Sequence, residues 1–131
     1  MAVIDASVLV AYLAGGDRAV AARDVVFANA GSLWAPHLVD AEVGHALRRV
    51  VSAGQLSALK GRSALQDLAD LPIERVPHRA LLDRAWQLRP NVSFYVGLYI
   101  ALAETLQTPL VTLDERLAAA PGSRAKVRLL A

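Results

Sequence analysis

Two short apolar runs that each end at an isolated carboxylate constrain the fold most strongly. The run from Ala2 to Ile4 leads into Asp5, and the run from Leu110 to Leu113 leads into Asp114. In an open α/β sheet, the carboxyl ends of the parallel strands meet at one edge and present side chains to a crevice. If the two runs are neighbouring strands, we therefore expect Asp5 and Asp114 to project from the same edge of the sheet.

Apolar runs rich in β-branched residues alternate with segments of helical periodicity along the whole chain. This alternation is typical of an α/β sandwich built on a parallel sheet, whose strands are buried on both faces. The expected strands are Ala2–Ile4, Ser32–Ala35, Ile73–Val76, Leu110–Thr112 and Val127–Leu130. The expected helices are Ser7–Leu13, Ala19–Ala28, Val39–Ala53, Ser57–Ala69, Arg79–Leu88, Phe94–Leu106 and Glu115–Ala119. We expect one continuous domain over residues 1–131.

The composition narrows the class of protein. The 131 residues contain no cysteine, which excludes disulfides and thiolate metal sites and suits a reducing compartment. The longest apolar stretch, Phe94 to Ala103, is far shorter than the roughly 20 residues of a membrane span. Asp5 interrupts the first apolar run, so we expect no signal peptide and predict a cytoplasmic protein, although the sequence leaves a secreted form open. The net charge of +2 permits a polyanionic partner without requiring one.

A third carboxylate, Glu42, is expected beside the buried stripe of the helix over Val39–Ala53. At about 100° per residue, Glu42 falls at the margin of that stripe, where a side chain is partly desolvated. Acidic groups gathered in such a place repel one another, which raises their pKa values unless a cation neutralises them. Oxygen-only ligands with open positions suit Mg²⁺ or Mn²⁺, and such a site favours the hydrolysis of phosphodiesters.

Four short motifs span nearly the whole chain. They are Val-Ile-Asp5-Ala-Ser7-Val, Asp40-Ala-Glu42-Val-Gly-His-Ala-Leu-Arg-Arg49, Tyr99-Ile-Ala-Leu-Ala-Glu104 and Leu110-Val-Thr-Leu-Asp114-Glu-Arg-Leu117. In this order and spacing they resemble the motifs of PIN-domain ribonucleases, in particular the VapC toxins of type II toxin-antitoxin systems. The resemblance implies a PIN-like three-layer sandwich with a parallel sheet of about five strands flanked by helices. It also implies a homodimer, RNA cleavage dependent on Mg²⁺ or Mn²⁺, and inhibition by a cognate VapB antitoxin.

The resemblance further implies roles for individual residues. Asp5, Glu42 and Asp114 match the acidic positions of the family's catalytic site. Asp5 and Asp114 would ligate the metal, and Glu42 would bind or orient the attacking water. Ser7 matches a small hydroxyl residue beside the metal. Apart from the resemblance, Ser93 and Tyr95 lie close enough to position 96 in the sequence to be candidates for holding a metal-bound water.

One departure from the family pattern lies at Val96. VapC toxins usually carry an aspartate metal ligand at this position, in a Tyr-Asp-Ala-x-Tyr motif that reads Tyr-Val96-Gly97-Leu-Tyr here. The adjacent Gly97, where the family often has alanine, also lowers helix propensity by up to about 1 kcal/mol. Glu104 is no obvious substitute for the missing acid, because it lies eight residues along the helix, about 12 Å in axial rise.

Three explanations remain open for Val96. The substitution is a deliberate or selected inactivation that lets a toxin gene be expressed, or it marks a natural divergent nuclease that manages with three acids and weaker metal binding. Alternatively, the chain is a catalytically inactive PIN-fold subunit that dimerises and binds an antitoxin without cleaving RNA. For the function of the chain as a whole, a nuclease of the same fold that cleaves DNA instead of RNA is a further alternative.

Simpler structural roles remain open for the same residues. Asp5 and Asp114 are each placed to cap the helix that follows, since aspartate is a favoured N-cap, and Glu42 alone is typical of a solvated helix residue. Arg48 and Arg49 follow Glu42 and would track an RNA backbone, although solvated helix faces carry such charges routinely. Six apolar residues near the acids are candidates for an antitoxin groove or for ordinary core: Leu9, Tyr12, Leu13, Leu47, Val50 and Val51.

Overall fold

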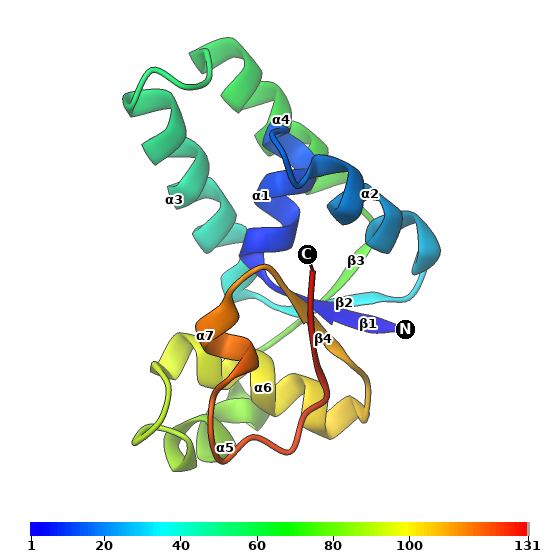
Figure 1. Cartoon of the computed structure of the whole chain (residues 1–131), viewed down its shortest axis with the longest axis vertical. Helices are drawn as coiled ribbons and strands as arrows, with labels where there is room; N and C mark the ends of the chain where they lie inside the picture. Colours follow the sequence, from blue (N-terminus) through cyan, green and yellow to red (C-terminus); the bar gives the residue numbers. More distant parts are fainter. Residues whose placement is uncertain (131) are drawn as a thin grey trace.

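A parallel sheet of five strands forms the centre of the computed structural model, which describes residues 1–130 (Figure 1). The strands are β1 (Ala2–Ile4), β2 (Leu33–Pro36), β3 (Ile73–Val76), β4 (Leu110–Thr112) and β5 (Val127–Leu129). Their order across the sheet is β3-β2-β1-β4-β5, and every neighbouring pair is parallel. The predicted parallel sheet is confirmed, with β2 shifted by one residue and β5 one residue shorter than expected.

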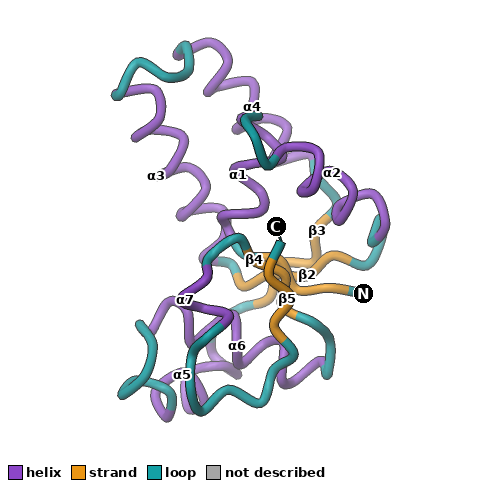
Figure 2. Tube along the Cα trace, in the orientation of Figure 1, coloured by secondary structure: helices purple, strands orange, loops and turns teal. Residues whose placement is uncertain are grey.

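Helices cover both faces of this sheet. They are α1 (Ala6–Ala14), α2 (Ala19–Ala28), α3 (Leu38–Ser52), α4 (Ala58–Asp70), α5 (Leu82–Gln87), α6 (Phe94–Leu106) and α7 (Glu115–Ala118). Figures 1 and 2 show α1 to α4 on one side of the strands and α5 to α7 on the other, which is the predicted three-layer sandwich. The single helix expected over residues 79–88 is instead a 3-10 turn, Arg79–Leu81, followed by α5.

The order of the strands brings the two strand-end aspartates together. β1 is the central strand and pairs with β4, with Ile4 opposite Val111. Because the pair is parallel, the residues that follow the two strands leave the sheet at the same edge. The expectation that Asp5 and Asp114 share one edge is therefore confirmed.

Burial explains why the central strands β1 and β4 and the helix α6 are almost wholly apolar. Val3, Ile4 and Leu110 are completely buried, as expected for strands that helices cover on both faces. On α6, all residues from 97 to 103 are buried. A helix surrounded in this way has no polar face, which accounts for the long apolar stretch in the sequence. In the part of the chain that the structure describes, no helix is long and apolar enough to cross a membrane.

Two polar contacts fix the beginning of α3, the helix that carries Glu42. The backbone N–H of Leu38 donates to Nε2 of His78 at 2.9 Å, and Nε of Arg75 donates to Oδ2 of Asp40 at 2.8 Å. Both partners lie on or just after β3. From this anchored end, α3 runs away from the sheet and returns through α4 as a helical hairpin (Figure 1). Only the first turns of α3 therefore lie beside the edge that carries the aspartates.

Candidate active site

Asp5 is held at the carboxyl edge of the sheet through both of its carboxylate oxygens. Ser7 Oγ donates to Oδ1 at 2.5 Å, and Thr112 Oγ1 donates to Oδ2 at 2.5 Å. The backbone N–H of Val8 also donates to Oδ1, at 3.3 Å, which makes Asp5 the N-cap of α1. The simpler capping role is confirmed, and the role of Asp5 as a metal ligand stays a prediction.

Burial controls the protonation of Asp5. The residue is 7% exposed, and desolvation raises the pKa of its carboxyl group above the usual value. The hydrogen bonds from Ser7, Thr112 and the backbone of Val8 lower the pKa, but they do not offset the desolvation. The charged form of Asp5 therefore lacks a compensating positive group among its immediate partners.

Two hydroxyl groups join the loops that carry Asp5 and Asp114. Ser7 Oγ accepts the backbone N–H of Leu113 at 3.0 Å, and Thr112 Oγ1 accepts that of Asp114 at 2.9 Å. Since both hydroxyls also donate to Asp5, the loop after β4 is fixed relative to the end of β1. Ser7 thus lies against Asp5, and its place beside a metal stays a prediction. Thr112 was missed, although a polar residue at the end of an apolar strand was a usable signal.

Asp114 directs its carboxylate toward the beginning of α7. Its Oδ1 accepts the backbone N–H of Arg116 at 2.9 Å, which confirms the expected capping role. The guanidinium of Arg116 lies 3.8 Å from the same oxygen, but its side chain is 96% exposed, so this ion pair contributes little stability. Asp114 is therefore held mainly by the backbone and is more accessible than Asp5.

Glu42 is half-buried on α3, and its carboxylate binds the phenol of Tyr99 on α6. Tyr99 Oη donates to Glu42 Oε1 at 2.7 Å. Burial raises the pKa of the Tyr99 phenol well above its usual value, and the hydrogen bond and the charges of Glu42, Asp5 and Asp40 raise it further. The negative charges of Asp5 and Glu42 thus both disfavour deprotonation of the Tyr99 phenol. Sequence reasoning gave Tyr99 no role, although a phenol within a wholly apolar helix was a signal that it has a buried acceptor.

Val96 lies in the first turn of α6, half-buried and packed against the core. Ser93 is the N-cap of this helix, and its Oγ accepts the backbone N–H of Val96 at 3.1 Å. Position 96 is therefore the third helical residue, where a carboxylate would interact favourably with the helix N-terminus. Valine presents only hydrocarbon at this place.

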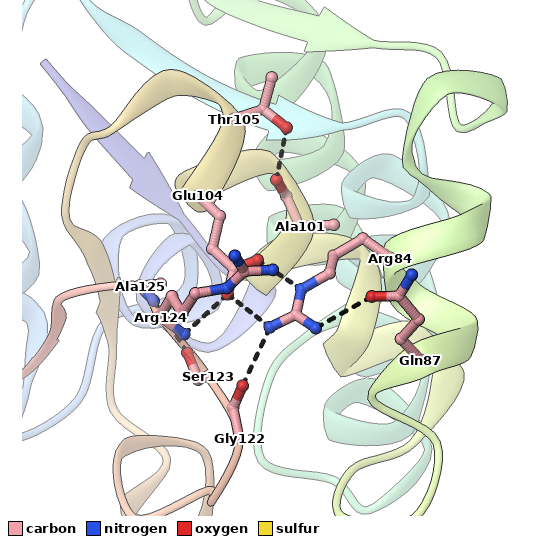
Figure 3. Close-up of polar contacts among 9 residues, drawn as sticks. All are labelled: Arg84, Gln87, Ala101, Glu104, Thr105, Gly122, Ser123, Arg124 and Ala125. Atoms are coloured by element: carbon pink, nitrogen blue, oxygen red, sulfur yellow. Dashed lines mark hydrogen bonds and ion pairs between the residues drawn. The ribbon is translucent and has the colours of Figure 1, made fainter.

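Glu104 belongs to a separate polar network, drawn in Figure 3. Arg84 donates to its two carboxylate oxygens at 2.7 and 3.1 Å, and the backbone N–H of Arg124 donates at 2.7 Å. Burial by itself would raise the pKa of Glu104, but the hydrogen bonds and positive charges of Arg84 and Arg124 outweigh burial and lower it. Both oxygens of Glu104 are engaged here, which confirms that this residue does not replace the acid missing at Val96.

A cavity of about 770 Å³ opens beside Glu42, between α1 and α3. His45, Arg49 and Tyr95 are among the side chains that line it. Arg48 lines a smaller hollow of about 220 Å³ between α3 and α4. Because consecutive helical residues point about 100° apart, the two neighbouring arginines face different surfaces. Of these two arginines, Arg49 is the one that lines the same cavity as Glu42.

Six apolar residues were candidates for an antitoxin groove or for ordinary core, and none of them lines the cavity beside Glu42: Leu9, Tyr12, Leu13, Leu47, Val50 and Val51. Leu9 and Leu47 are core residues, and Tyr12 and Leu13 line a separate hollow against the end of α4. Ordinary packing explains Leu9 and Leu47. A place in an antitoxin groove stays a prediction for the other four. The cavity beside Glu42 instead uses the adjacent stripe of α1, which begins at Ala6.

Carboxylate oxygens such as those of Asp5 and Asp114 are the donors that a hard divalent cation prefers. Within residues 1–130, no three Asp, Glu, His or Cys side chains gather closely enough to form a metal site by themselves. Asp5 and Asp114 nevertheless supply carboxylates at one edge, and the raised pKa of Asp5 reflects an uncompensated desolvated charge that a cation would stabilise. Mg²⁺ commonly binds through one or two carboxylates and keeps several waters, which matches this donor set.

Comparison with known proteins identifies the family. The model of the PIN domain family matches residues 2–123. The chain belongs to this family. It is 47% identical to Ribonuclease VapC1 of Mycobacterium tuberculosis over 130 residues, which cover 98% of this chain and 96% of that protein. It is 42% identical over 117 residues to Ribonuclease VapC9 of the same organism, covering 89% and 88% of the two chains. The predicted relationship to VapC proteins is confirmed.

Solved structures share the PIN-domain architecture of this protein. VapC20 of Mycobacterium tuberculosis, described as a sarcin-ricin loop cleaving toxin, superimposes with a TM-score of 0.73 at 16% identity, covering 94% of this chain and 96% of that chain. VapBC2 from Rickettsia felis, bound to a DNA fragment from its promoter, gives a TM-score of 0.69 at 13% identity, covering 99% and 98%. At these identities the likeness establishes the fold.

Proposed function

We propose that this PIN-domain protein is the toxin of a VapBC type II toxin-antitoxin system, an endoribonuclease that uses Mg²⁺, or Mn²⁺, to cleave RNA in the cytoplasm. One observation carries the proposal. Asp5 and Asp114 lie at one edge of the sheet, joined through the hydroxyl of Thr112, in a chain 47% identical to a protein named Ribonuclease VapC1. Two carboxylates fixed at one edge are what a metal-dependent phosphodiesterase needs.

Each acidic residue has a distinct proposed role. Asp5 and Asp114 hold the metal ion, and Glu42 binds or orients the attacking water. When bound there, Mg²⁺ would lower the pKa of a water molecule that it holds and would neutralise negative charge on the phosphate. Ser7 acts indirectly by keeping Asp5 oriented, and Ser93 acts indirectly by fixing the first turn of α6.

Val96 weakens or abolishes this activity. The position that supplies a metal ligand in VapC toxins here supplies a half-buried hydrocarbon surface. Loss of a residue that merely supports a metal ligand typically costs about 10- to 100-fold in affinity or activity, and loss of a ligand should cost at least as much. This observation also favours a second candidate, a catalytically inactive PIN-fold subunit that dimerises and binds an antitoxin without cleaving RNA.

A cognate VapB antitoxin is the proposed protein partner. Solved structures of the same fold include a toxin-antitoxin complex from Klebsiella pneumoniae, with a TM-score of 0.65, and VapBC2 from Rickettsia felis. The cavity beside Glu42 has apolar walls and carries both acidic and basic side chains, Glu42 and Asp17 beside Arg18 and Arg49. Its apolar walls suit an antitoxin segment, whose basic residue would contact Glu42. A homodimer, with the possibility of larger toxin-antitoxin assemblies, is part of the same proposal.

Restoring the missing acid tests the function. We would induce the chain and its Val96→Asp variant in cells, record growth, and map the 5′ ends of cellular RNA. Val96→Asn is the matched control, since it has the shape of aspartate without its charge. Toxicity with defined RNA cleavage in Val96→Asp alone supports a disabled nuclease, and toxicity in both chains means that three acids suffice. Toxicity in neither contradicts the nuclease proposal and favours the binding subunit.

A further inference from the structure

The hydroxyl of Tyr99 joins two helical layers that otherwise lie on opposite sides of the sheet. Tyr99 belongs to α6 and Glu42 to α3, which are on different faces of the strands in Figures 1 and 2. The hydrogen bond between them, 2.7 Å long, connects residues 57 apart in the sequence. Glu42 is thus attached both to its own helix and, through its carboxylate, to the helix that carries Val96.

Tyr99 is suited to act as a fixed hydrogen-bond donor. It is 3% exposed, and its ring lies within the apolar run of α6, so it has little freedom to leave its place. Its phenol remains protonated and neutral because burial and the neighbouring acids disfavour the tyrosinate. A buried neutral phenol beside a carboxylate has one favourable arrangement, in which the O–H donates to the carboxylate oxygen.

Glu42 depends on this donor more than Asp5 depends on any one of its partners. Asp5 accepts two hydroxyl hydrogen bonds and one from the backbone. Among the residues that the structure describes, Tyr99 is the one hydrogen-bond partner recorded for the Glu42 carboxylate, and none of the ion pairs involves Glu42. A glutamate side chain on a helix otherwise has several rotamers available, so removal of this donor releases the carboxylate.

We propose that Tyr99 is a positioning residue, which holds Glu42 Oε1 so that the carboxylate stays at the cavity between α1 and α3. The inference rests on the proposed function, in which Glu42 binds or orients the attacking water. Tyr99 does not touch the substrate, and its effect passes entirely through Glu42. A misplacement of about 1 Å costs a catalytic group about 100-fold in rate, so loss of the phenol hydroxyl reduces turnover more than substrate binding.

The test is Tyr99→Phe, which keeps the ring and removes only the hydroxyl. Tyr12→Phe is the matched control, since Tyr12 is a partly buried tyrosine that lines a separate hollow against α4. In the Val96→Asp background, we expect Tyr99→Phe to lower kcat for RNA cleavage at least 10-fold with KM changed less than 2-fold. Tyr12→Phe should leave both constants unchanged. Equal kcat values for Tyr99→Phe and its parent would overturn the inference.

A double-mutant cycle identifies the route of the effect. Glu42→Asp keeps the charge but is one methylene too short to keep the bond to Tyr99. We expect Tyr99→Phe and Glu42→Asp together to be little worse in kcat than Glu42→Asp alone, because both remove the same contact. Additive losses would show that Tyr99 acts in another way and would overturn the inference.

A structural measurement decides the inference even if no variant cleaves RNA. In crystal structures of the chain and of Tyr99→Phe, we expect the Glu42 carboxylate to leave its position or to occupy several rotamers in the variant. A Glu42 carboxylate unchanged in the variant would overturn the positioning role. Absence of cleavage in the Val96→Asp parent, by contrast, contradicts the nuclease proposal alone. The two failures are therefore distinguishable.

Discussion

Gly97 lies so close to Ala85 that helices α5 and α6 meet backbone to backbone. A Cβ atom added at Gly97 would come within 3.1 Å of both the Cα and the carbonyl oxygen of Ala85. A glycine inside a helix costs stability when only helix propensity is considered. The close approach of α5 supplies the physical reason for its presence here.

We expect Gly97→Ala to destabilise the protein by about 1 to 3 kcal/mol, because backbone atoms of Ala85 cannot move aside as a flexible side chain would. Urea unfolding measures this change. Gly44→Ala is the control, since a Cβ there meets only a Leu65 side-chain carbon at 3.8 Å. The control should gain up to about 1 kcal/mol from helix propensity. A gain of stability in both variants would contradict the packing argument.

We expect Asp5→Asn to stabilise the metal-free protein at neutral pH while abolishing activity. Burial raises the pKa of Asp5 in the folded state, so the charged form destabilises the fold above that pKa. This destabilisation is absent below about pH 3.9, the pKa of an aspartate in the unfolded chain. It develops as the pH rises through the higher pKa that Asp5 has in the folded protein. The gain should be about 0.5 to 2 kcal/mol, typical of relieving a strained functional site.

Thermal unfolding in EDTA from pH 3 to pH 8 checks this prediction. The Tm difference between Asp5→Asn and the parent should be largest at neutral pH and should shrink as pH falls. Asp17→Asn, at an exposed position, is the control and should show no such trend. A lower Tm for Asp5→Asn at pH 7 would show that the hydrogen bonds of the carboxylate outweigh its desolvation.

Glu104→Gln should show the opposite dependence on pH. The contacts from Arg84 and Arg124 lower the pKa of Glu104 in the folded protein. The contribution of its carboxylate to the free energy of unfolding is therefore fully present above the pKa of glutamate in the unfolded chain, and it is lost as the pH falls through the lower pKa of the folded protein. We expect a loss of about 1 to 2 kcal/mol at pH 7, as for a hydrogen bond to a charged group. Urea unfolding at pH 7 and pH 3, beside the exposed-site variant Glu74→Gln, measures the difference. A loss equal at both pH values would contradict the ionic origin.

Arg49→Ala should weaken RNA binding, whereas Arg48→Ala should not. Arg49 lines the cavity beside Glu42, and Arg48 lines a separate hollow. Loss of one phosphate contact should lower the salt-dependence slope of binding by about 1. Fluorescence anisotropy with a short single-stranded RNA, in EDTA to prevent cleavage, provides the affinity at several salt concentrations. Equal effects of the two substitutions would show that the cavity does not direct the RNA.

The strands and the position of the two aspartates were predictable because they depend on local pattern. Buried parallel strands are short apolar runs, and the residue that follows such a run must leave the sheet at its carboxyl edge. Asp5 and Asp114 are both of this kind, and the structure places them at one edge. The N-caps at Asp5, Ser93 and Asp114 were predictable for the same reason, since a cap bonds to a backbone group two or three residues away.

The contacts that hold the site depend on residues far apart in the sequence. Thr112 binds Asp5 across 107 residues, and Tyr99 binds Glu42 across 57. Neither pairing has a periodicity or spacing that the chain displays, because each exists only once two layers have packed. Arg48 and Arg49 line different hollows because a different helix lies opposite each of them. Position 97 likewise requires glycine because α5 lies against it. The sequence by itself therefore determined the sheet, its acidic edge and the missing acid at Val96. Only the tertiary structure decided which side chains hold those acids in place, because packing alone sets the distances between separate helices.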